Sequence, residues 1–222
     1  MTTYNLNDVY VSVQGEGVMT GVPMVIVRLH GCPVGCAFCD TKETWRTSQE
    51  TKVATLEEAL GANERWCEVS AEDLAAYCRT MTNLDWILLT GGEPAEQLLG
   101  PLVAAFHEQE FYVAIETSGT AVGHLDTMVD WITVSPKIGM PGLRAIQEDA
   151  ITSADEIKHV VGRLEDIDKL DAMLGLYEPK EGSTVCLQPL SGSAAATKLC
   201  IAVCLERGWR LSIQTHKLVG LR

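Results

Sequence analysis

Residues 24–40 read MVIVRLHGCPVGCAFCD, in which a short apolar run, Met24–Leu29, leads directly into a loop with three cysteines. An apolar run of this length that is rich in Val and Ile predicts a buried β-strand. The same order, an apolar run and then a polar signature, recurs along the chain, and this recurrence decides the predicted fold.

Six further apolar runs follow, and stretches with helical spacing separate most of them. Strands that alternate with helices imply right-handed crossovers and a mainly parallel sheet, so the predicted class is α/β. The predicted strands are Met24–Leu29, Trp86–Leu89, Tyr112–Ile115, Trp131–Val134, Glu156–Val161, Thr184–Leu187 and Arg210–Ile213, and the predicted helices are Ala71–Thr80, Gln97–Glu110, Leu164–Leu174 and Ala194–Arg207.

Polar signatures come directly after most of the predicted strands. Parallel sheets carry their functional groups at the carboxyl ends of the strands, so these segments are expected to converge on one rim and form a single site. They are His30 with the cysteine loop, Thr90–Pro94 (TGGEP), Glu116–Thr120 (ETSGT), Ser135–Lys137 (SPK), Gln188–Pro189 and Gln214–Lys217 (QTHK).

Length and composition suit a single domain. A chain of 222 residues with 46% hydrophobic content can bury one substantial core, and we expect one domain over residues 1–222. The polar stretch at about 43–70 interrupts the strand and helix pattern and is interpreted as an insertion. It contains Trp45 and Trp66, and it either folds over the cysteine loop or forms a partner surface.

Charge and hydropathy limit the location and the partners. The first ten residues, MTTYNLNDVY, do not resemble a signal peptide, and no apolar run is long enough to cross a bilayer, so a cytoplasmic protein without membrane contact is expected. The formal net charge of −13 and the lack of a basic run argue against direct nucleic-acid binding and favour a small-molecule substrate.

The eight cysteines divide into two groups. Cys67, Cys78 and Cys186 are expected to be small buried residues. Cys200 and Cys204 lie four residues apart on a predicted helix, where they could bind a second metal, but nothing nearby completes such a site and we expect them in the core.

The loop cysteines, Cys32, Cys36 and Cys39, have the spacing CxxxCxxC. Three thiolates on a cluster of four irons leave one iron without a protein ligand, and that iron can hold a small molecule. The alternative is a structural zinc with His30 or Asp40 as the fourth ligand, although structural zinc usually takes its ligands from two separated pairs.

The spacing and the aromatic Phe38 resemble the radical S-adenosylmethionine (SAM) superfamily. Combined with seven further motifs, they resemble the 7-carboxy-7-deazaguanine synthase family over residues 14 to 217. Those motifs are QGEG at 14–17, Arg28, Asp40-Thr41, TGGEP, ETSGT, SPK and the closing QTHK.

The resemblance implies a truncated, open radical SAM barrel and a lyase of queuosine biosynthesis, in the pathway of tRNA modification. The implied reaction is the Mg²⁺-dependent ring contraction of 6-carboxy-5,6,7,8-tetrahydropterin to 7-carboxy-7-deazaguanine with loss of ammonia. The reduced 4Fe-4S cluster would cleave SAM to methionine and a 5′-deoxyadenosyl radical. A homodimer and an external, flavodoxin-like one-electron donor are also implied.

The resemblance assigns a role to each matching position. Cys32, Cys36 and Cys39 would hold the 4Fe-4S cluster, and Thr41 would help hold Mg²⁺ together with the substrate carboxylate. SAM would contact Phe38, Cys39, Asp40, Gly91, Gly92, Glu93, Glu116, Ser135, Pro136, Lys137 and Gln188. The substrate would contact Val13, Gln14, Gly15, Glu16, Arg28, Thr90 and His216.

Chemistry supports several of these roles but leaves alternatives open. Gln14 and Glu16 can pair with the edge of an aminopyrimidinone ring, or QGEG can be a plain turn. Arg28 in an apolar strand needs a partner, either a substrate carboxylate or a structural carboxylate. Thr41 can instead cap a turn, and His216 can instead hydrogen-bond within the C-terminal segment.

Two rival functions remain open at this point. An activase of a glycyl radical enzyme would share the cluster and the TGGEP motif, but it would not need QGEG or Arg28. A zinc or electron-transfer module could use the cysteine loop alone, but it would have no reason to place polar residues after five other strands.

Overall fold

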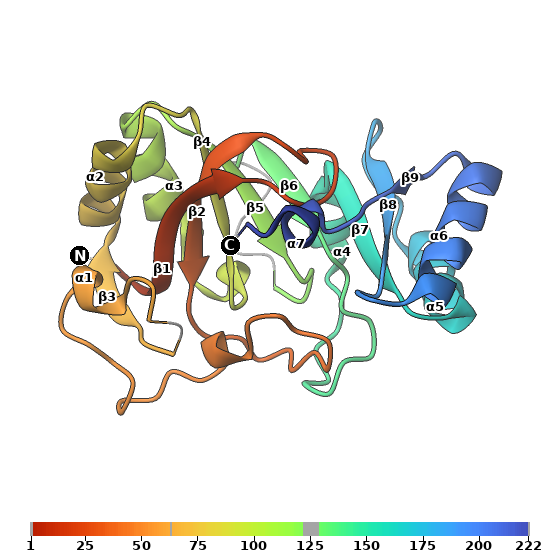
Figure 1. Ribbon diagram of the computed structural model, residues 1–222, viewed down its shortest axis with the longest axis horizontal. Helices are drawn as coiled ribbons and strands as arrows, with labels where there is room; N and C mark the ends of the chain where they lie inside the picture. Colours follow the sequence, from red (N-terminus) through yellow and green to blue (C-terminus); the bar gives the residue numbers. More distant parts are fainter. Residues whose placement is uncertain (1, 63, 122–128, 222) are drawn as a thin grey trace.

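The computed structural model describes residues 2–62, 64–121 and 129–221. These residues form a nine-stranded sheet with the order β3-β1-β2-β4-β5-β6-β7-β8-β9 (Figure 1). All neighbours from β2 to β9 are parallel, while β1 is antiparallel to both β2 and β3. The strands are β1 Thr3–Val13, β2 Pro23–Leu29, β3 Cys67–Ser70, β4 Trp86–Gly91, β5 Tyr112–Thr117, β6 Trp131–Val134, β7 Glu156–Val161, β8 Thr184–Pro189 and β9 Arg210–Leu211.

The predicted α/β class and the mainly parallel sheet are confirmed, and each predicted strand is present. The strand β1 was not predicted, because Asn5, Asn7 and Asp8 interrupt its apolar alternation. Partners far along the chain compensate for these polar groups: the Asn5 N–H donates to the Gln97 side chain at 2.9 Å, and the buried Asn7 amide donates to the Arg65 carbonyl at 2.8 Å.

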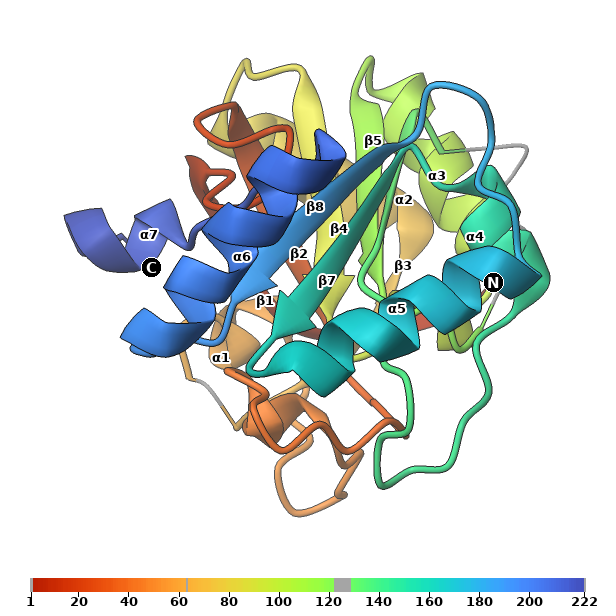
Figure 2. The same cartoon turned by 90° about the vertical axis from the view of Figure 1, so that its right-hand side faces the viewer.

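The long helices cover one face of the sheet (Figure 2). Each contributes a buried side chain to the main core, for example Leu74, Leu102, Ile151, Leu170 and Cys200. These helices are α2 Ala71–Met81, α3 Leu99–Glu108, α4 Glu148–Ser153, α5 Leu164–Leu176 and α6 Ala194–Arg207, and the short elements are η1 Lys42–Thr44, α1 Leu56–Ala59, η2 Pro94–Glu96 and α7 Thr215–Val219. The five cysteines expected in the core, Cys67, Cys78, Cys186, Cys200 and Cys204, are buried.

The opposite face of the sheet is apolar at one end and polar at the other. A small cluster of Met24, Ile26, Leu88 and Ala114 fills the end where the parallel strands begin. Because side chains alternate along a strand, the residues two and four positions further on share this face. They are the polar residues Arg28, Thr90 and Glu116, and the strand register places Thr133, Glu156, Lys158 and Gln188 on the same face.

The sheet is open, because its edge strands β3 and β9 do not pair with each other. The open sheet corresponds to the partial barrel that the family resemblance implies. In Figure 1 the cysteine loop lies beyond the carboxyl end of β2, beside the loop that follows β6.

The segment at 43–70 stays close to the sheet. Its last residues form β3, which pairs with β1. Trp66 is 2% exposed and stacks on His30 with the ring centroids 5.5 Å apart, while the Trp45 indole N–H donates to Cys39. These tryptophans therefore support the cysteine loop, and they do not form the exposed partner surface that the sequence left open.

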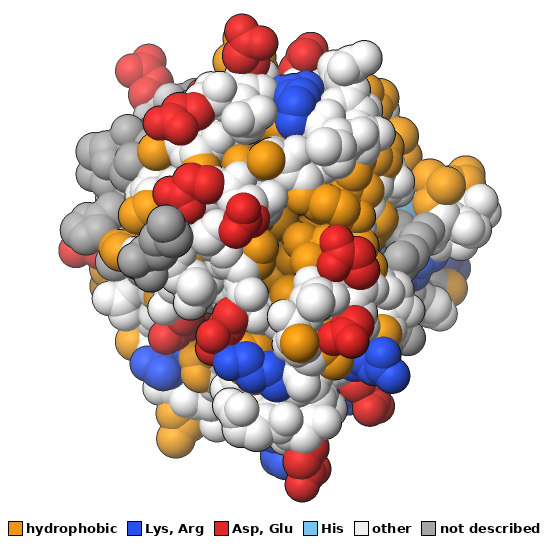
Figure 3. Space-filling model, turned by 90° about the vertical axis from the view of Figure 1, so that its left-hand side faces the viewer, with side chains coloured by type: hydrophobic (Ala, Val, Ile, Leu, Met, Phe, Trp, Pro, Cys, Tyr) orange, Lys and Arg blue, Asp and Glu red, His pale blue; other side chains and the backbone are white. Residues whose placement is uncertain are grey.

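The surface shown in Figure 3 is mixed in charge. Lys and Arg side chains are interspersed with Asp and Glu, and no basic patch forms on this face, which also exposes some apolar surface. In the part of the chain that the structure describes, no helix combines the length and the hydropathy needed to cross a bilayer.

Candidate functional site

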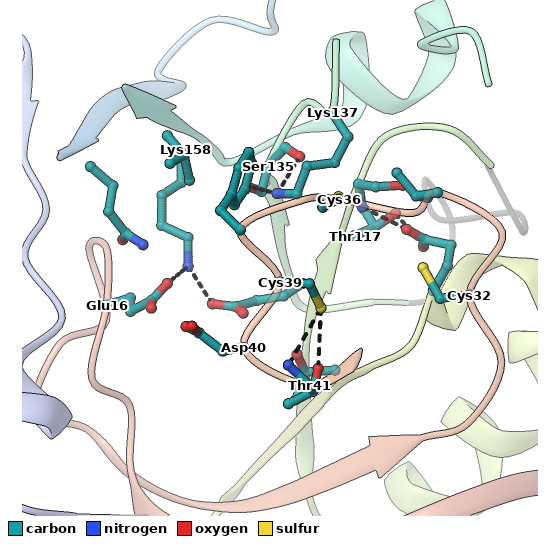
Figure 4. A pocket seen from close by; sticks show the side chains of 18 of the residues that line it. Glu16, Cys32, Cys36, Cys39, Asp40, Thr41, Thr117, Ser135, Lys137 and Lys158 are labelled. Carbon is teal, nitrogen blue, oxygen red and sulfur yellow. Dashed lines mark hydrogen bonds and ion pairs between the residues drawn. The ribbon is translucent and has the colours of Figure 1, made fainter. Parts of the chain in front are cut away.

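A single cavity lies where the sequence predicts the rim, between the carboxyl ends of the strands and the cysteine loop (Figure 4). Most of the predicted site residues line it. They are Glu16, Cys32, Cys36, Phe38, Cys39, Asp40, Thr41, Thr90, Gly91, Gly92, Glu93, Glu116, Ser135, Lys137 and Gln188.

Six predicted residues do not line this cavity. Pro136 lines a neighbouring hollow that shares Phe38 and Lys137 as its wall. The others are Val13, Gln14, Gly15, Arg28 and His216, which lie behind the lining side chains or beside them.

The cavity has further lining residues to which the sequence assigned no contact, although Thr117, Ser118, Pro189 and Gln214 belong to segments expected at this rim. The additional residues with polar side chains include Lys158, Gln214 and Trp45. A signal for Lys158 was available, because a lysine inside the apolar strand Glu156–Val161 needs a buried partner for the same reason as Arg28. The full set is Val34, Trp45, Thr117, Ser118, Lys158, Val160, Pro189, Leu190, Ser191 and Gln214.

Three free thiols face the cavity from the cysteine loop. Burial raises the pKa of Cys32 to about 11 and also raises that of Cys36, so both thiols stay neutral at pH 7 unless bound cations compensate their charge. Three soft sulfur ligands on one cavity wall fit the donor set of an iron-sulfur cluster.

Both candidates for a fourth zinc ligand already have hydrogen-bond partners, although His30 Nδ1 is buried without one. His30 is buried against Trp66, and its Nε2 lies 2.9 Å from the Arg46 carbonyl. The Asp40 carboxylate accepts from Lys217 at 2.9 Å and from Gln214 at 3.2 Å. Over residues 2–62, 64–121 and 129–221, no three His, Cys, Asp or Glu side chains gather at a spacing that would hold a single metal ion.

Thr41 lies against the last cysteine of the loop. Its backbone N–H donates to the Cys39 sulfur at 3.4 Å, and its hydroxyl lies 3.8 Å from the same atom. Thr41 is the N-cap residue of η1, but its side chain makes no capping hydrogen bond. The hydroxyl therefore faces the cavity and does not serve as a helix cap.

The Gly91-Gly92 pair brings β4 against β2 and the cysteine loop. Gly91 has φ +111°, and a Cβ there would lie 2.4 Å from the Leu29 carbonyl oxygen. A Cβ on Gly92 would lie 2.2 Å from the Gly31 carbonyl oxygen. Only glycine fits this approach, so the pair is required by the fold as well as by its position on the cavity wall.

Glu93 is a buried carboxylate with three donors. It accepts from the Thr117 hydroxyl at 2.6 Å, from the Ser118 N–H at 2.7 Å and from the Ala95 N–H at 3.0 Å. These bonds join TGGEP to ETSGT and orient the carboxylate on the cavity wall.

Lys158 is the centre of the polar network at the opposite wall. Its Nζ lies 2.6 Å from Glu16 Oε2 and 2.7 Å from Glu116 Oε1, and its side chain is only 3% exposed (Figure 4). Burial alone would raise the pKa of Glu16, but the Lys158 ammonium and the hydrogen bonds from Lys158 and Gln214 lower it to about 2. The two carboxylates raise the pKa of Lys158 despite its burial. Glu16 and Lys158 are therefore both charged at pH 7.

Amide side chains complete this network. Gln14 Nε2 donates to Glu116 at 3.0 Å, and Gln214 Nε2 donates to Glu16 at 2.7 Å. The Gln14 side-chain oxygen accepts from the Glu16 N–H at 3.1 Å. The QGEG segment is thus a turn whose side chains are held in fixed positions at the cavity, which is more than the plain turn that the sequence left open.

Arg28 and His216 lie close to this network. The Arg28 guanidinium donates to the Tyr10 hydroxyl at 2.9 Å, and among the described residues it forms no ion pair with a carboxylate. The His216 ring lies against Gly15, where a Cβ would come within 2.1 Å of Nδ1. His216 therefore packs against the QGEG turn, and the Arg28 guanidinium is held by Tyr10 on the polar face.

Lys137 spans the other end of the cavity. Its Nζ donates to the Ser135 carbonyl at 3.0 Å and to the Ser135 hydroxyl, and it lies 5.9 Å from the centre of the Phe38 ring. Burial lowers the pKa of Lys137. The SPK motif and the cysteine loop thus meet at one corner of the cavity.

Comparisons with known proteins agree with this arrangement. A family model described as a 4Fe-4S single cluster domain matches residues 13–135. The chain is similar to the 7-carboxy-7-deazaguanine synthase of Escherichia coli (strain K12), at 41% identity over 98% of this chain and 99% of the relative. It is also similar to the protein of that name in Bacteroides thetaiotaomicron, at 34% identity over 98% of both chains. The crystal structure of QueE from Escherichia coli superposes with a TM-score of 0.88 at 41% identity and covers 96% of this chain and 95% of that one.

Proposed function

Because this chain belongs to the 7-carboxy-7-deazaguanine synthase family of radical SAM enzymes, we propose that it converts 6-carboxy-5,6,7,8-tetrahydropterin to 7-carboxy-7-deazaguanine with release of ammonia. The observation that carries the proposal is one cavity with the three loop thiols on one wall and the network of Glu16, Glu116 and Lys158 on the other. A cluster site and a polar recognition site thus face the same space.

Cys32, Cys36 and Cys39 hold the 4Fe-4S cluster in this proposal. When bound, the cluster and SAM supply a one-electron cleavage of SAM that starts the reaction. Glu93 accepts from the ammonium of SAM with the free capacity of its oxygens, and the backbone around it borders the methionine part. The remaining contacts to SAM come from Phe38, Asp40, Gly91, Gly92, Glu116, Ser135, Pro136, Lys137 and Gln188.

Glu16 recognises the aminopyrimidinone edge of the substrate, with Gln14 behind it. The lowered pKa of Glu16 keeps it an acceptor for ring N–H and amine donors. Arg28 and Thr90, which are register partners on β2 and β4, lie on the same face and bind the substrate carboxylate and ring edge. Val13, Gly15 and His216 hold the turn that carries Gln14 and Glu16.

Further parts of the proposal rest on the resemblance alone. Thr41 helps hold a Mg²⁺ ion that also binds the substrate carboxylate, and Mg²⁺ accepts a single threonine because it retains several waters. The enzyme serves the queuosine pathway of tRNA modification in the cytoplasm, as a homodimer reduced by a flavodoxin-like donor.

The test is anaerobic incubation of the reconstituted protein with SAM, reductant, Mg²⁺ and the carboxytetrahydropterin, followed by mass analysis. We expect 7-carboxy-7-deazaguanine from the wild type. Arg28→Ala should form 5′-deoxyadenosine and methionine from SAM without this product, because Arg28 lies outside the cluster wall. Loss of SAM binding in Arg28→Ala would contradict its role toward the substrate.

The same preparation separates the rival functions. A cluster protein is brown, with thiolate-to-iron charge transfer, whereas a zinc module is colourless. A brown protein that cleaves SAM but leaves the carboxytetrahydropterin unchanged would favour the activase of a glycyl radical enzyme.

A further inference from the structure

The Trp45 side chain points at the thiol of Cys39, the last cysteine of the loop. The indole Nε1–H donates to the Cys39 sulfur at 3.4 Å, and Trp45 lines the same cavity as the three loop thiols. We propose that this indole N–H raises the reduction potential of the bound cluster, an inference that rests on the cluster assignment in the proposed function.

Backbone contacts on both sides hold Trp45 in place. The Gly31 N–H donates to the Thr44 carbonyl at 2.7 Å, and the Cys32 N–H donates to the Trp45 carbonyl at 3.1 Å. On the far side, His30 Nε2 lies 2.9 Å from the Arg46 carbonyl. The segment Thr44–Arg46 is thus bonded to the end of β2 at consecutive residues, and the indole does not need to reorganise in order to donate to Cys39.

The turn before Trp45 is equally fixed. Thr44 is fully buried, and its hydroxyl donates to the Thr41 carbonyl at 2.8 Å. The Trp45 N–H closes η1 on the Lys42 carbonyl at 3.2 Å. Because η1 returns the chain toward the cysteine loop, Trp45 lies six residues after Cys39 and still reaches its sulfur.

The physical effect follows from charge. Reduction adds one electron to the cluster from an external one-electron donor, with no bond made or broken in the protein, and the added negative charge spreads onto the thiolates. A hydrogen-bond donor to a thiolate stabilises the more negative state more strongly, so the donor raises the potential. Trp45 therefore makes the reduction of the cluster easier.

A second contribution of the ring must be kept separate. Trp45 and Cys32 line both the cavity and a second hollow, so the indole would also limit the access of solvent to a bound cluster. Solvent exposure is itself a determinant of cluster potential. Trp45→Phe removes the N–H donor and retains an aromatic ring between the two spaces, whereas alanine would change both.

The experiment is a redox titration of the reconstituted protein, monitored by the EPR signal of the reduced cluster. For Trp45→Phe we expect a several-fold fall in the ratio of reduced to oxidised cluster at a fixed potential, with unchanged iron and sulfide content. A tenfold fall corresponds to about 59 mV for a one-electron couple. Trp131→Phe is the matched control, because it also removes an indole hydrogen bond, from Trp131 Nε1 to the Thr133 hydroxyl at 3.0 Å, away from the loop. The control should titrate like the wild type.

Each outcome is decisive. Equal midpoints for wild type and Trp45→Phe, at equal cluster content, would overturn the inference and leave the proposed function intact. A wild type that takes up no cluster would instead refute the proposed function. If Trp45→Phe loses its iron, the Trp45 indole can be replaced with benzothiophene, which exchanges the N–H for sulfur and preserves the ring shape. A midpoint potential equal to that of the wild type in this protein would equally overturn the inference.

Discussion

Lys158→Met is the most informative single change at this site. It removes the ammonium that lies 2.6 Å from Glu16 and 2.7 Å from Glu116, while the unbranched apolar side chain fills most of the same space. Glu16 and Glu116 then face each other without a cation in a poorly solvated cavity. We expect a large loss in the free energy of unfolding of the cluster-free protein at pH 7.

The magnitude follows from the burial of the pair. Lys158 and Glu16 are 3% and 16% exposed. The pKa of Glu16 falls from 4.5 to about 2, and at about 1.4 kcal/mol for each pKa unit this is about 3 kcal/mol. Breaking a buried ion pair by removing one partner costs about 3–5 kcal/mol, which agrees.

The loss should depend on pH in a defined direction. The folded-state pKa of Glu16 is below its unfolded value, so its stabilisation is complete above about pH 4.5 and is lost as the pH falls toward 2. The pKa of Lys158 is raised, so its stabilisation is complete below 10.5 and is lost at higher pH. The difference between wild type and Lys158→Met should therefore be greatest from about pH 5 to pH 10 and should shrink in acid.

The assay is urea unfolding followed by circular dichroism at pH 7 and pH 3.5. Lys180→Met is the control, because Lys180 lies 2.6 Å from Asp155 but its side chain is 42% exposed, and such pairs contribute about 0–1 kcal/mol. The reasoning is refuted if Lys158→Met costs no more than Lys180→Met at pH 7, or if its cost is the same at both pH values.

Three further predictions concern the cluster wall. Cys36→Ala should abolish cluster retention and turnover while Cys200→Ala keeps both, and iron and sulfide counts after reconstitution would expose a wrong ligand assignment. Gly92→Ala places a Cβ 2.2 Å from the Gly31 carbonyl oxygen, so it should destabilise the protein by about 1–3 kcal/mol, as overpacking does. It should also weaken SAM binding, measured by equilibrium dialysis, and an unchanged affinity for SAM would contradict this. Thr41→Ala should keep its iron, but its reaction rate should no longer depend on Mg²⁺. Its substrate KM should rise about tenfold or more, since misplacement of the substrate by about 1 Å can cost on the order of a hundredfold in rate. An unaltered Mg²⁺ titration would remove Thr41 from the metal site.

Local sequence patterns were sufficient for the parallel part of the sheet and for the cavity. Runs such as Glu156–Val161 have the composition of buried strands, and a parallel sheet brings the residues that follow its strands to one edge regardless of the details of packing. For this reason Cys32, Gly92, Ser135 and Gln188 could be placed around one cavity before the structure was known.

The partners of the charged residues could not be read in this way. Lys158 binds Glu16 across 142 residues of sequence, and Gln214 binds Glu16 across 198. The strand β1 could not be predicted either, because partners such as Gln97 and Arg65 satisfy its polar groups.

The sequence by itself determined the α/β class, the loop with three cysteines and the rim on which the cavity lies, because these depend on spacing within one strand, helix or loop. Only the tertiary structure decided which carboxylates share Lys158, why Gly91 and Gly92 must lack a Cβ, and that the Trp45 indole donates to Cys39. The physical reason is that hydrogen bonds and ion pairs act over a few ångströms in space, and a one-dimensional pattern does not show which distant residues come that close.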